Sequence, residues 1–137
     1  MTKLHIILAF FASIVGYSQN INLTTGQVEA LLCKTWQFDF LLAEGKQTLQ
    51  RDLPHGRTYD YCFKDDFTLT VLSKDNIINK GSWCFDPQKS WIEIQISGDN
   101  TLRIIELENR RMIMCTKDGI SKDPKKLPSN YFQFSPR

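Results

Sequence analysis

Hydrophobic and polar positions alternate along most of this chain, in short runs separated by polar turns. Between residues 59 and 115 a run of alternating aromatic or β-branched residues is repeatedly followed by a turn rich in Asp, Asn, Gly and Lys. Such alternation is typical of strands with one buried face, and turns this short favour hairpins. The pattern therefore predicts consecutive antiparallel strands over residues 59–63, 67–72, 77–85, 91–96, 102–107 and 112–115.

Further elements flank these strands. Residues 35–42 alternate aromatic and polar side chains and predict a first strand, with which a last strand over residues 131–134 could pair. A second strand begins at Gln47 and resumes at Thr58, and the Pro and Gly between the two parts are typical of a bend or bulge. Thr24 and Gln27 have the spacing of a capping box, so a short helix should follow them.

The predicted elements number eight strands and one leading helix, with no helix suited to cross between parallel strands. A meander of this length either closes on itself or leaves an exposed edge. We therefore predict an all-β fold, an eight-stranded up-and-down antiparallel β-barrel with a short N-terminal helix over one end. An open two-sheet sandwich is the alternative.

Residues 1–18 are predicted to be a cleaved secretory signal peptide. Lys3 gives the chain a basic start, residues 6–15 are apolar, and small residues at Gly16 and Ser18 precede the expected cleavage point. The apolar run is well short of the roughly 18 residues that a spanning helix needs, so we expect no membrane span. Residues 19–137 then form a single β-barrel domain of an exported, periplasmic or extracellular protein.

The charge balance gives little sign of a nucleic-acid partner. The chain has 17 Lys and Arg residues against 15 Asp and Glu residues, a formal net charge of +2. The lysine-rich stretch over residues 117–126 also contains two aspartates and is typical of a solvated loop. We therefore expect no nucleic-acid binding.

Four cysteines lie after the predicted signal peptide: Cys33, Cys62, Cys84 and Cys115. An even number in an exported chain favours disulfide bonds, and all four are disulfide candidates. Cys62 and Cys84 alternate with aromatic neighbours in the same way, which makes them the first choice for a pair, although an intervening strand would separate them. The alternative is that some of the four are buried as small apolar side chains.

Catalytic chemistry has few candidates. His55 is the single histidine of residues 19–137, in a Pro-His-Gly stretch typical of an exposed loop, and Asp65 and Asp66 are adjacent carboxylates better suited to a turn. No phosphate-binding glycine loop, calcium loop or Cys-x-x-Cys motif is present. We therefore predict no catalytic residues, no metal site and no cofactor, and expect that the protein is not an enzyme.

A leading helix, Trp36 on the first strand and eight consecutive strands resemble the lipocalins and the wider group of lipocalin-like barrels. The family's Gly-x-Trp signature corresponds here to Lys34-Thr35-Trp36, with Lys in place of Gly. Residues 66–68 and 80–83 are similar to a turn and a Gly-x-Trp strand of small secreted bacterial lipocalin-like proteins. The resemblance covers residues 31–115, and it implies that Arg137, after the last strand, stacks over Trp36.

Large apolar side chains gather on one side of the predicted strands, which we assign to the barrel interior; Phe67 is among them. An eight-stranded barrel is just wide enough for such side chains to fill, or to hold one small ligand, and both alternatives remain open. The tyrosines and Trp83 lead the candidates because their polar tips could mark an apolar pocket. The predicted ligand-binding residues are Trp36, Phe38, Tyr59, Tyr61, Leu69, Trp83, Phe85 and Ile94.

Two hypotheses of function follow. The first is an exported monomer that binds or carries a small hydrophobic molecule in the open end of the barrel, without covalent chemistry. The second is a filled barrel that binds another envelope protein or blocks a protease. Trp91 bears on the choice, because its phase places it outside, either as a cap over a hairpin or as part of a partner-binding surface.

Overall fold

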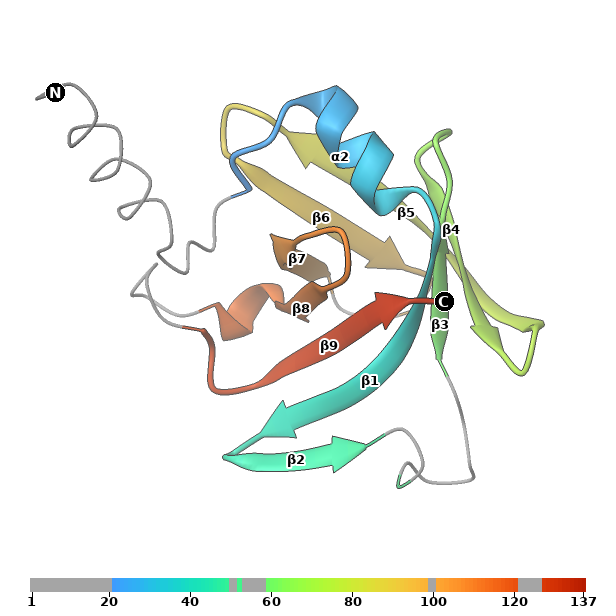
Figure 1. The fold of residues 1–137 in the computed structure, drawn as a ribbon, viewed down its shortest axis with the longest axis vertical. Coiled ribbons are helices and arrows are strands. Elements are labelled where there is room, and N and C mark those ends of the chain that lie inside the picture. The colour runs from blue at the N-terminus through green and yellow to red at the C-terminus, as the bar shows by residue number, and fades with distance from the viewer. Residues whose placement is uncertain (1–20, 50–51, 53–58, 99–100, 121–126) are drawn as a thin grey trace, which may run out of the picture.

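The protein was analysed as a computed structural model, which describes residues 21–49, 52, 59–98, 101–120 and 127–137 (Figure 1). The signal peptide predicted over residues 1–18, and His55, lie outside these residues. The described residues form one α-helix, α2 (Thr25–Leu32), one 3-10 turn, η3 (Lys117–Gly119), and nine strands. The strands are β1 (Thr35–Ala43), β2 (Lys46–Leu49), β3 (Asp60–Phe63), β4 (Thr68–Ser73), β5 (Asn76–Asp86), β6 (Trp91–Ile96), β7 (Leu102–Leu107), β8 (Met112–Thr116) and β9 (Tyr131–Pro136).

The sheet closes into a barrel of eight antiparallel strands. Strands follow one another in space as they do in the chain, and β9 pairs back onto β1, with Trp36 opposite Pro136 and Leu42 opposite Tyr131. β2 and β3 both lie on the other side of β1, at its two ends, and act as one interrupted strand. The predicted eight-stranded barrel with one short helix is therefore confirmed, and the open sandwich is excluded.

Alternation along each strand builds the core inside this ring. Across β5 and β6, Trp83 lies opposite Ile94 and Phe85 opposite Ile92, and Ile92 in turn faces Ile104 on β7. Because side chains opposite one another point to the same face, each such row adds a layer to the interior. Trp83, Ile92, Ile94 and Ile104 are buried, so the layers are filled.

Helix α2 closes the end of the barrel at which β1 begins (Figure 1). Thr24 and Gln27 form the predicted capping box, each side chain accepting from the other's backbone N–H. Val28 and Leu32 turn inward and are fully buried. The indole Nε1 of Trp36 donates to the carbonyl of Leu32 at 3.0 Å, which satisfies a helix-end carbonyl inside the core.

A second, smaller apolar cluster lies outside the barrel. Ile105, Ile113 and Cys115 are buried there, with Ile120, Leu127 and Tyr131 packed against them. Ile105 faces outward because it follows the inward Ile104, and the bulge between Ile104 and Glu106 returns Leu107 to the interior, opposite the buried Met112. Sequence alternation alone gave no sign of this second core.

The disulfide prediction is wrong in this structure, because all four cysteines, which lie within the described residues, are free thiols. Cys62 on β3 is opposite Thr70 of β4, and Cys84 lies on β5, so β4 separates the first-choice pair. Cys115 is buried in the outer cluster, and burial raises the pKa of its thiol to about 11. Cys33 ends helix α2.

Phe67 also departs from its expected place. Its side chain is 48% exposed rather than inside, since the residue belongs to the turn before β4 and has a positive φ of 67°. The ring still contacts Trp83, with the two ring centroids 5.0 Å apart. The inward phase of β4 begins only at Leu69, which is buried.

Candidate functional site

A cavity of about 490 Å³ opens at the end of the barrel opposite helix α2. Its walls come from four neighbouring strands and the residue before the first of them. The lining residues are Tyr59, Tyr61, Val71, Ser73, Ile78, Asn79 and Ile96. The volume lies within the range of roughly 300–1,000 Å³ that small-molecule sites occupy.

The strand register explains why these side chains meet. Tyr61 of β3 lies opposite Val71 of β4, and Val71 lies opposite Asn79 of β5, so the three form one row across the inner wall. The next row toward the helix includes Leu69, Gly81 and Ile96. Because Gly81 has no side chain, this row carries less bulk than the filled layers beyond it. The cavity therefore lies where the inward side chains become smaller.

Aromatic rings lie beside the cavity, toward β9. The Tyr61 ring lies 5.1 Å from that of Phe134, centroid to centroid, and Phe134 meets Phe38 edge-to-face at 5.6 Å. Phe38 also contacts Phe132 at 6.4 Å. Ring pairs at these distances add to the stabilisation that their burial gives, so this part of the wall should be rigid.

Polar groups form the larger part of the accessible cavity wall, beside the apolar side chains of Val71, Ile78 and Ile96. The side-chain amide of Asn79 donates to the carbonyl of Ser97 at 3.2 Å and accepts from the backbone N–H of Lys80 at 2.9 Å. These two bonds hold the Asn79 amide against the strand. Ser73 adds a hydroxyl, and Tyr59 and Tyr61 add phenols. Such a wall suits a small molecule that combines an apolar part with hydrogen-bonding groups.

The structure divides the eight predicted ligand-binding residues into two groups. Tyr59 and Tyr61 line the cavity. The other six belong to the core and are absent from the lining of this cavity; five are buried and Phe85 is partly buried. These six are Trp36, Phe38, Leu69, Trp83, Phe85 and Ile94. Their contact with a ligand stays a prediction, and in the structure they pack in the core rather than along this cavity.

Five of the seven lining residues were not among the ligand-binding residues predicted from the sequence. Val71 and Ile96 follow the inward phase of their strands, and Ser73 continues the phase of Val71, so alternation could have placed these three. Ile78 is different. The register of β4 against β5 shifts between Val71, opposite Asn79, and Leu72, opposite Ile77, which leaves Ile78 as an extra residue that no alternation predicts.

Arg137 does not occupy the place that the lipocalin resemblance implies. Its guanidinium pairs with Asp75, in the turn between β4 and β5, and with Asp60 at 3.3 Å. The cation that lies over the Trp36 ring is instead Lys34, with its Nζ 4.9 Å from the ring centroid. Burial raises the pKa of Asp60, and the charge of Arg137 opposes that shift.

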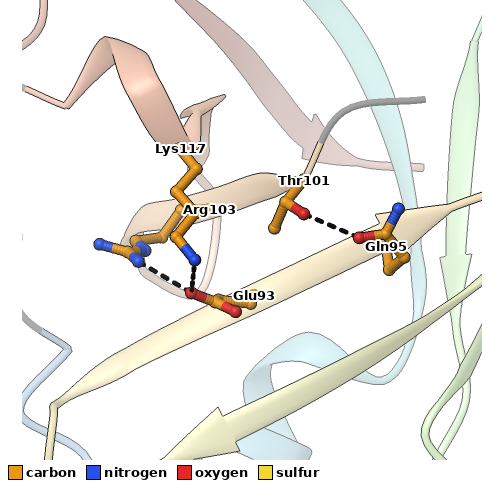
Figure 2. A network of polar contacts seen from close by, with 5 residues as sticks. All are labelled: Glu93, Gln95, Thr101, Arg103 and Lys117. Carbon is orange, nitrogen blue, oxygen red and sulfur yellow. Dashed lines mark hydrogen bonds and ion pairs between the residues drawn. The ribbon is translucent and has the colours of Figure 1, made fainter.

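A polar network on the outer face ties β6 to β7 (Figure 2). Glu93 accepts from Arg103 at 2.8 Å and lies 3.6 Å from the ammonium of Lys117, while the Thr101 hydroxyl donates to Gln95 at 2.7 Å. The hydrogen bond from Arg103 lowers the pKa of Glu93 below its ordinary value. Each of these contacts joins neighbouring segments of the wall, so the network is structural.

Trp91 packs against this same network. The guanidinium carbon of Arg103 lies 3.8 Å from the centroid of the Trp91 ring, and the Nζ of Lys89 lies 5.2 Å from it. Cation–π contacts of this kind account for an outward Trp that is partly buried. The packing interpretation of Trp91 is thus favoured over a partner-binding surface.

The adjacent carboxylates Asp65 and Asp66 lie in the turn before β4. Asp66 accepts from both the backbone N–H and the hydroxyl of Thr68, and the hydroxyl bond lowers the pKa of Asp66, as expected for a carboxylate that forms a turn. Within the described residues, no three His, Cys, Asp or Glu side chains lie close enough to hold a metal ion together. In the same part of the chain, no helix has the length and apolar character to cross a membrane.

Comparison with known proteins gave no relative. No protein-family model matches the chain, and neither a curated protein nor a solved structure matches it significantly. The cavity and its lining residues are therefore the basis for any statement about function.

Proposed function

We propose that the protein is a lipocalin-like carrier or sensor, which binds a small apolar ligand non-covalently in the open end of its barrel. One observation carries the proposal: the cavity of about 490 Å³ opposite helix α2. Export through the N-terminal segment would place this activity in the periplasm or outside the cell. No covalent step is needed, because burial of apolar surface drives the binding.

The cavity wall suggests how such a ligand would be held. Its apolar body would lie against Val71 and Ile96, with the Tyr61 ring on one side. Removing apolar surface from water contributes about 25 cal/mol per Å² before the costs of association are subtracted. The Ser73 hydroxyl and the phenol of Tyr59 would then orient one polar group of the ligand.

The binding of another envelope protein is the second candidate. It is favoured by the solid packing of the helix-covered half of the barrel, where Trp36 and Ile94 are fully buried. Native mass spectrometry of the protein purified from its own envelope separates the two candidates. A co-purified small molecule supports the carrier, and a stoichiometric protein partner without one supports the interaction module.

Titration with N-phenyl-1-naphthylamine tests the carrier directly, because this small neutral molecule becomes fluorescent in apolar surroundings. The wild-type protein should bind it saturably with one site. Ser73→Trp would place an indole in the cavity and should weaken binding by at least about tenfold, which corresponds to 1.4 kcal/mol.

Thr70→Trp is the matched control, since Thr70 lies on the same strand but outside the cavity lining. It should leave the affinity unchanged, and thermal unfolding should show that both variants fold. The proposal fails if the wild-type protein shows no saturable binding of such apolar probes, or if the two variants weaken binding equally.

A further inference from the structure

The hairpin between β4 and β5 exposes two large apolar side chains beside the cavity. Ile77 is 57% exposed and Ile78 is 49% exposed. Phe67 is the other exposed large apolar side chain among the described residues, and it lies at the helix-covered end. We refer to residues 74–80, the tip of this hairpin, as the β4–β5 lip.

The local sequence explains why the lip has this shape. Lys74 and Asp75 both have positive φ, 50° and 65°, as the two central residues of a tight hairpin turn require. The register shift that follows leaves Ile78 as the extra residue of β5. Ile77 and Ile78 therefore both lie outside the packed core, although Ile78 also lines the cavity. Apolar surface thus runs from the cavity wall to the outside of the protein.

Basic side chains flank this apolar tip. Lys74 and Lys80 are both exposed, one at each end of the lip. The acidic residue between them, Asp75, pairs with Arg137, which offsets its charge. The lip therefore combines exposed isoleucines with a cationic surround, the combination by which peripheral proteins hold to an anionic lipid surface.

We propose that the β4–β5 lip docks on an anionic membrane surface. Ile77 and Ile78 enter the interfacial layer, and Lys74 and Lys80 lie among the lipid phosphates. The mouth of the cavity then faces the bilayer, and an apolar ligand passes between membrane and cavity without crossing bulk water. Transfer of the ligand rests on the proposed carrier function, whereas the docking itself does not.

The small size of the lip favours a membrane over a protein partner. A specific protein interface usually buries about 1,200–2,000 Å² in total, far more than two isoleucines offer. Apolar contact and electrostatic attraction to anionic lipid add together, and attachment that rests on a few side chains is reversible. Reversible attachment is also what a carrier needs, because it has to leave the membrane with its ligand.

Sedimentation with sucrose-loaded vesicles tests this proposal. The wild-type protein should co-sediment with vesicles of equal parts phosphatidylcholine and phosphatidylglycerol, and only weakly with phosphatidylcholine alone. The double variant Ile77→Ser/Ile78→Ser should lower the partition coefficient by at least about tenfold, since it removes both apolar contacts. Lys74→Gln/Lys80→Gln should remove the preference for the anionic vesicles and its dependence on salt.

Phe67→Asn is the matched control, because it removes a comparably exposed apolar side chain from the opposite end and Asn tolerates the positive φ at this position. It should leave vesicle binding unchanged. Equal losses in Phe67→Asn and in the double variant would overturn the proposal. So would a wild-type protein that stays in the supernatant, or native mass spectrometry that shows a protein partner released by Ile77→Ser.

Ile77→Ser alone separates docking from ligand binding, because Ile77 is not among the residues that line the cavity. This variant should bind vesicles more weakly and keep the wild-type titration with N-phenyl-1-naphthylamine. A wild-type protein that binds vesicles but not the probe would refute the carrier function and leave docking in place. Binding of the probe without binding to vesicles would refute docking alone.

Discussion

The two ends of the barrel are built from the same strands but differ in what fills them. At the helix-covered end, Trp36 is fully buried and Trp83 is 3% exposed, and both belong to the core cluster that includes Val28 and Leu32 of helix α2. At the other end, the row of Tyr61, Val71 and Asn79 surrounds a cavity of about 490 Å³. Alternation forms the wall at both ends, so side-chain size and the helix decide which end is solid.

This difference separates stability from binding within one small domain. At the covered end, hydrogen bonds also join the segment before helix α2 to the barrel. One of them runs from the backbone N–H of Ile21 to the carbonyl of Ser90 at 2.6 Å. At the open end, Val71 and Ile96 belong to the core, whereas Tyr59 and Ser73 are only partly buried and contribute less to it. The predictions below test this separation.

The largest effect should come from removing the buried tryptophan of the covered end. Trp36→Ala should lower the free energy of unfolding by about 3–5 kcal/mol, because it leaves a large void and deprives the Leu32 carbonyl of its donor. Tyr59→Ala, at the open end, should cost about 1 kcal/mol, since Tyr59 is only partly buried. Guanidinium chloride unfolding measures both.

Probe binding should show the reverse order for these two variants. Tyr59→Ala should weaken the binding of N-phenyl-1-naphthylamine, whereas Trp36→Ala, studied where it remains folded, should retain it. Equal losses of stability in the two variants would show that the open end carries as much of the fold as the covered end, and the comparison would not hold.

A smaller effect is expected at Gly81, where the filled layers give way to the cavity. A Cβ at this position would lie 2.3 Å from the backbone oxygen of Gln95, so β5 and β6 would have to move apart. Gly81→Ala should cost about 1–3 kcal/mol. It should also weaken probe binding, because Ile96 lies opposite Gly81 and lines the cavity.

Gly26→Ala provides the control for this substitution. A Cβ at Gly26 meets no atom within 4 Å, and the residue lies in helix α2. The change should therefore stabilise the protein by about 0.5–1 kcal/mol through helix propensity. An unchanged stability and affinity in Gly81→Ala would mean that the close approach of β5 and β6 does not limit the size of the cavity.

Sequence alone predicted most of the fold, because the fold depends on patterns that are local. Strands β6 and β7 have the predicted bounds, the capping box at Thr24 is present, and the last strand pairs with the first. Alternation of period two identifies the inner face of each strand, and short turns fix the order of neighbours. Closure then follows from the number of strands.

The candidate site was predicted only in part, because its extent depends on tertiary packing. Tyr59 and Tyr61 were identified, but no local signal tells which inward residues are covered by a helix from elsewhere in the chain. A bulge was a second cause of error, since it left Ile78 as the extra residue of β5 beside the cavity. The disulfide prediction was wrong for a related reason, because the pairing of two cysteines depends on their distance across strands.

The smallest expected effect concerns the polar network on the outer face of β6 and β7. The pKa of Glu93 is lowered, chiefly by the hydrogen bond from Arg103, so the ionised form stabilises the fold. This stability is present above the ordinary pKa of 4.5 and is lost as the pH falls through the lower folded value. Glu93→Gln should therefore cost up to about 1 kcal/mol at pH 7, and the difference from wild type should shrink below pH 4.5.

Glu106, on the neighbouring strand, should respond with the opposite sign. Burial raises its pKa above 4.5, so protonation favours the folded state and the wild-type protein gains stability as the pH falls from the raised value toward 4.5. Glu106→Gln, which keeps an acceptor for Arg111, should lose this gain. Denaturant midpoints at pH 7 and pH 4 measure both effects. Because neither side chain lines the cavity, probe affinity should stay constant in both variants, and a change would show that the outer wall and the open end are coupled.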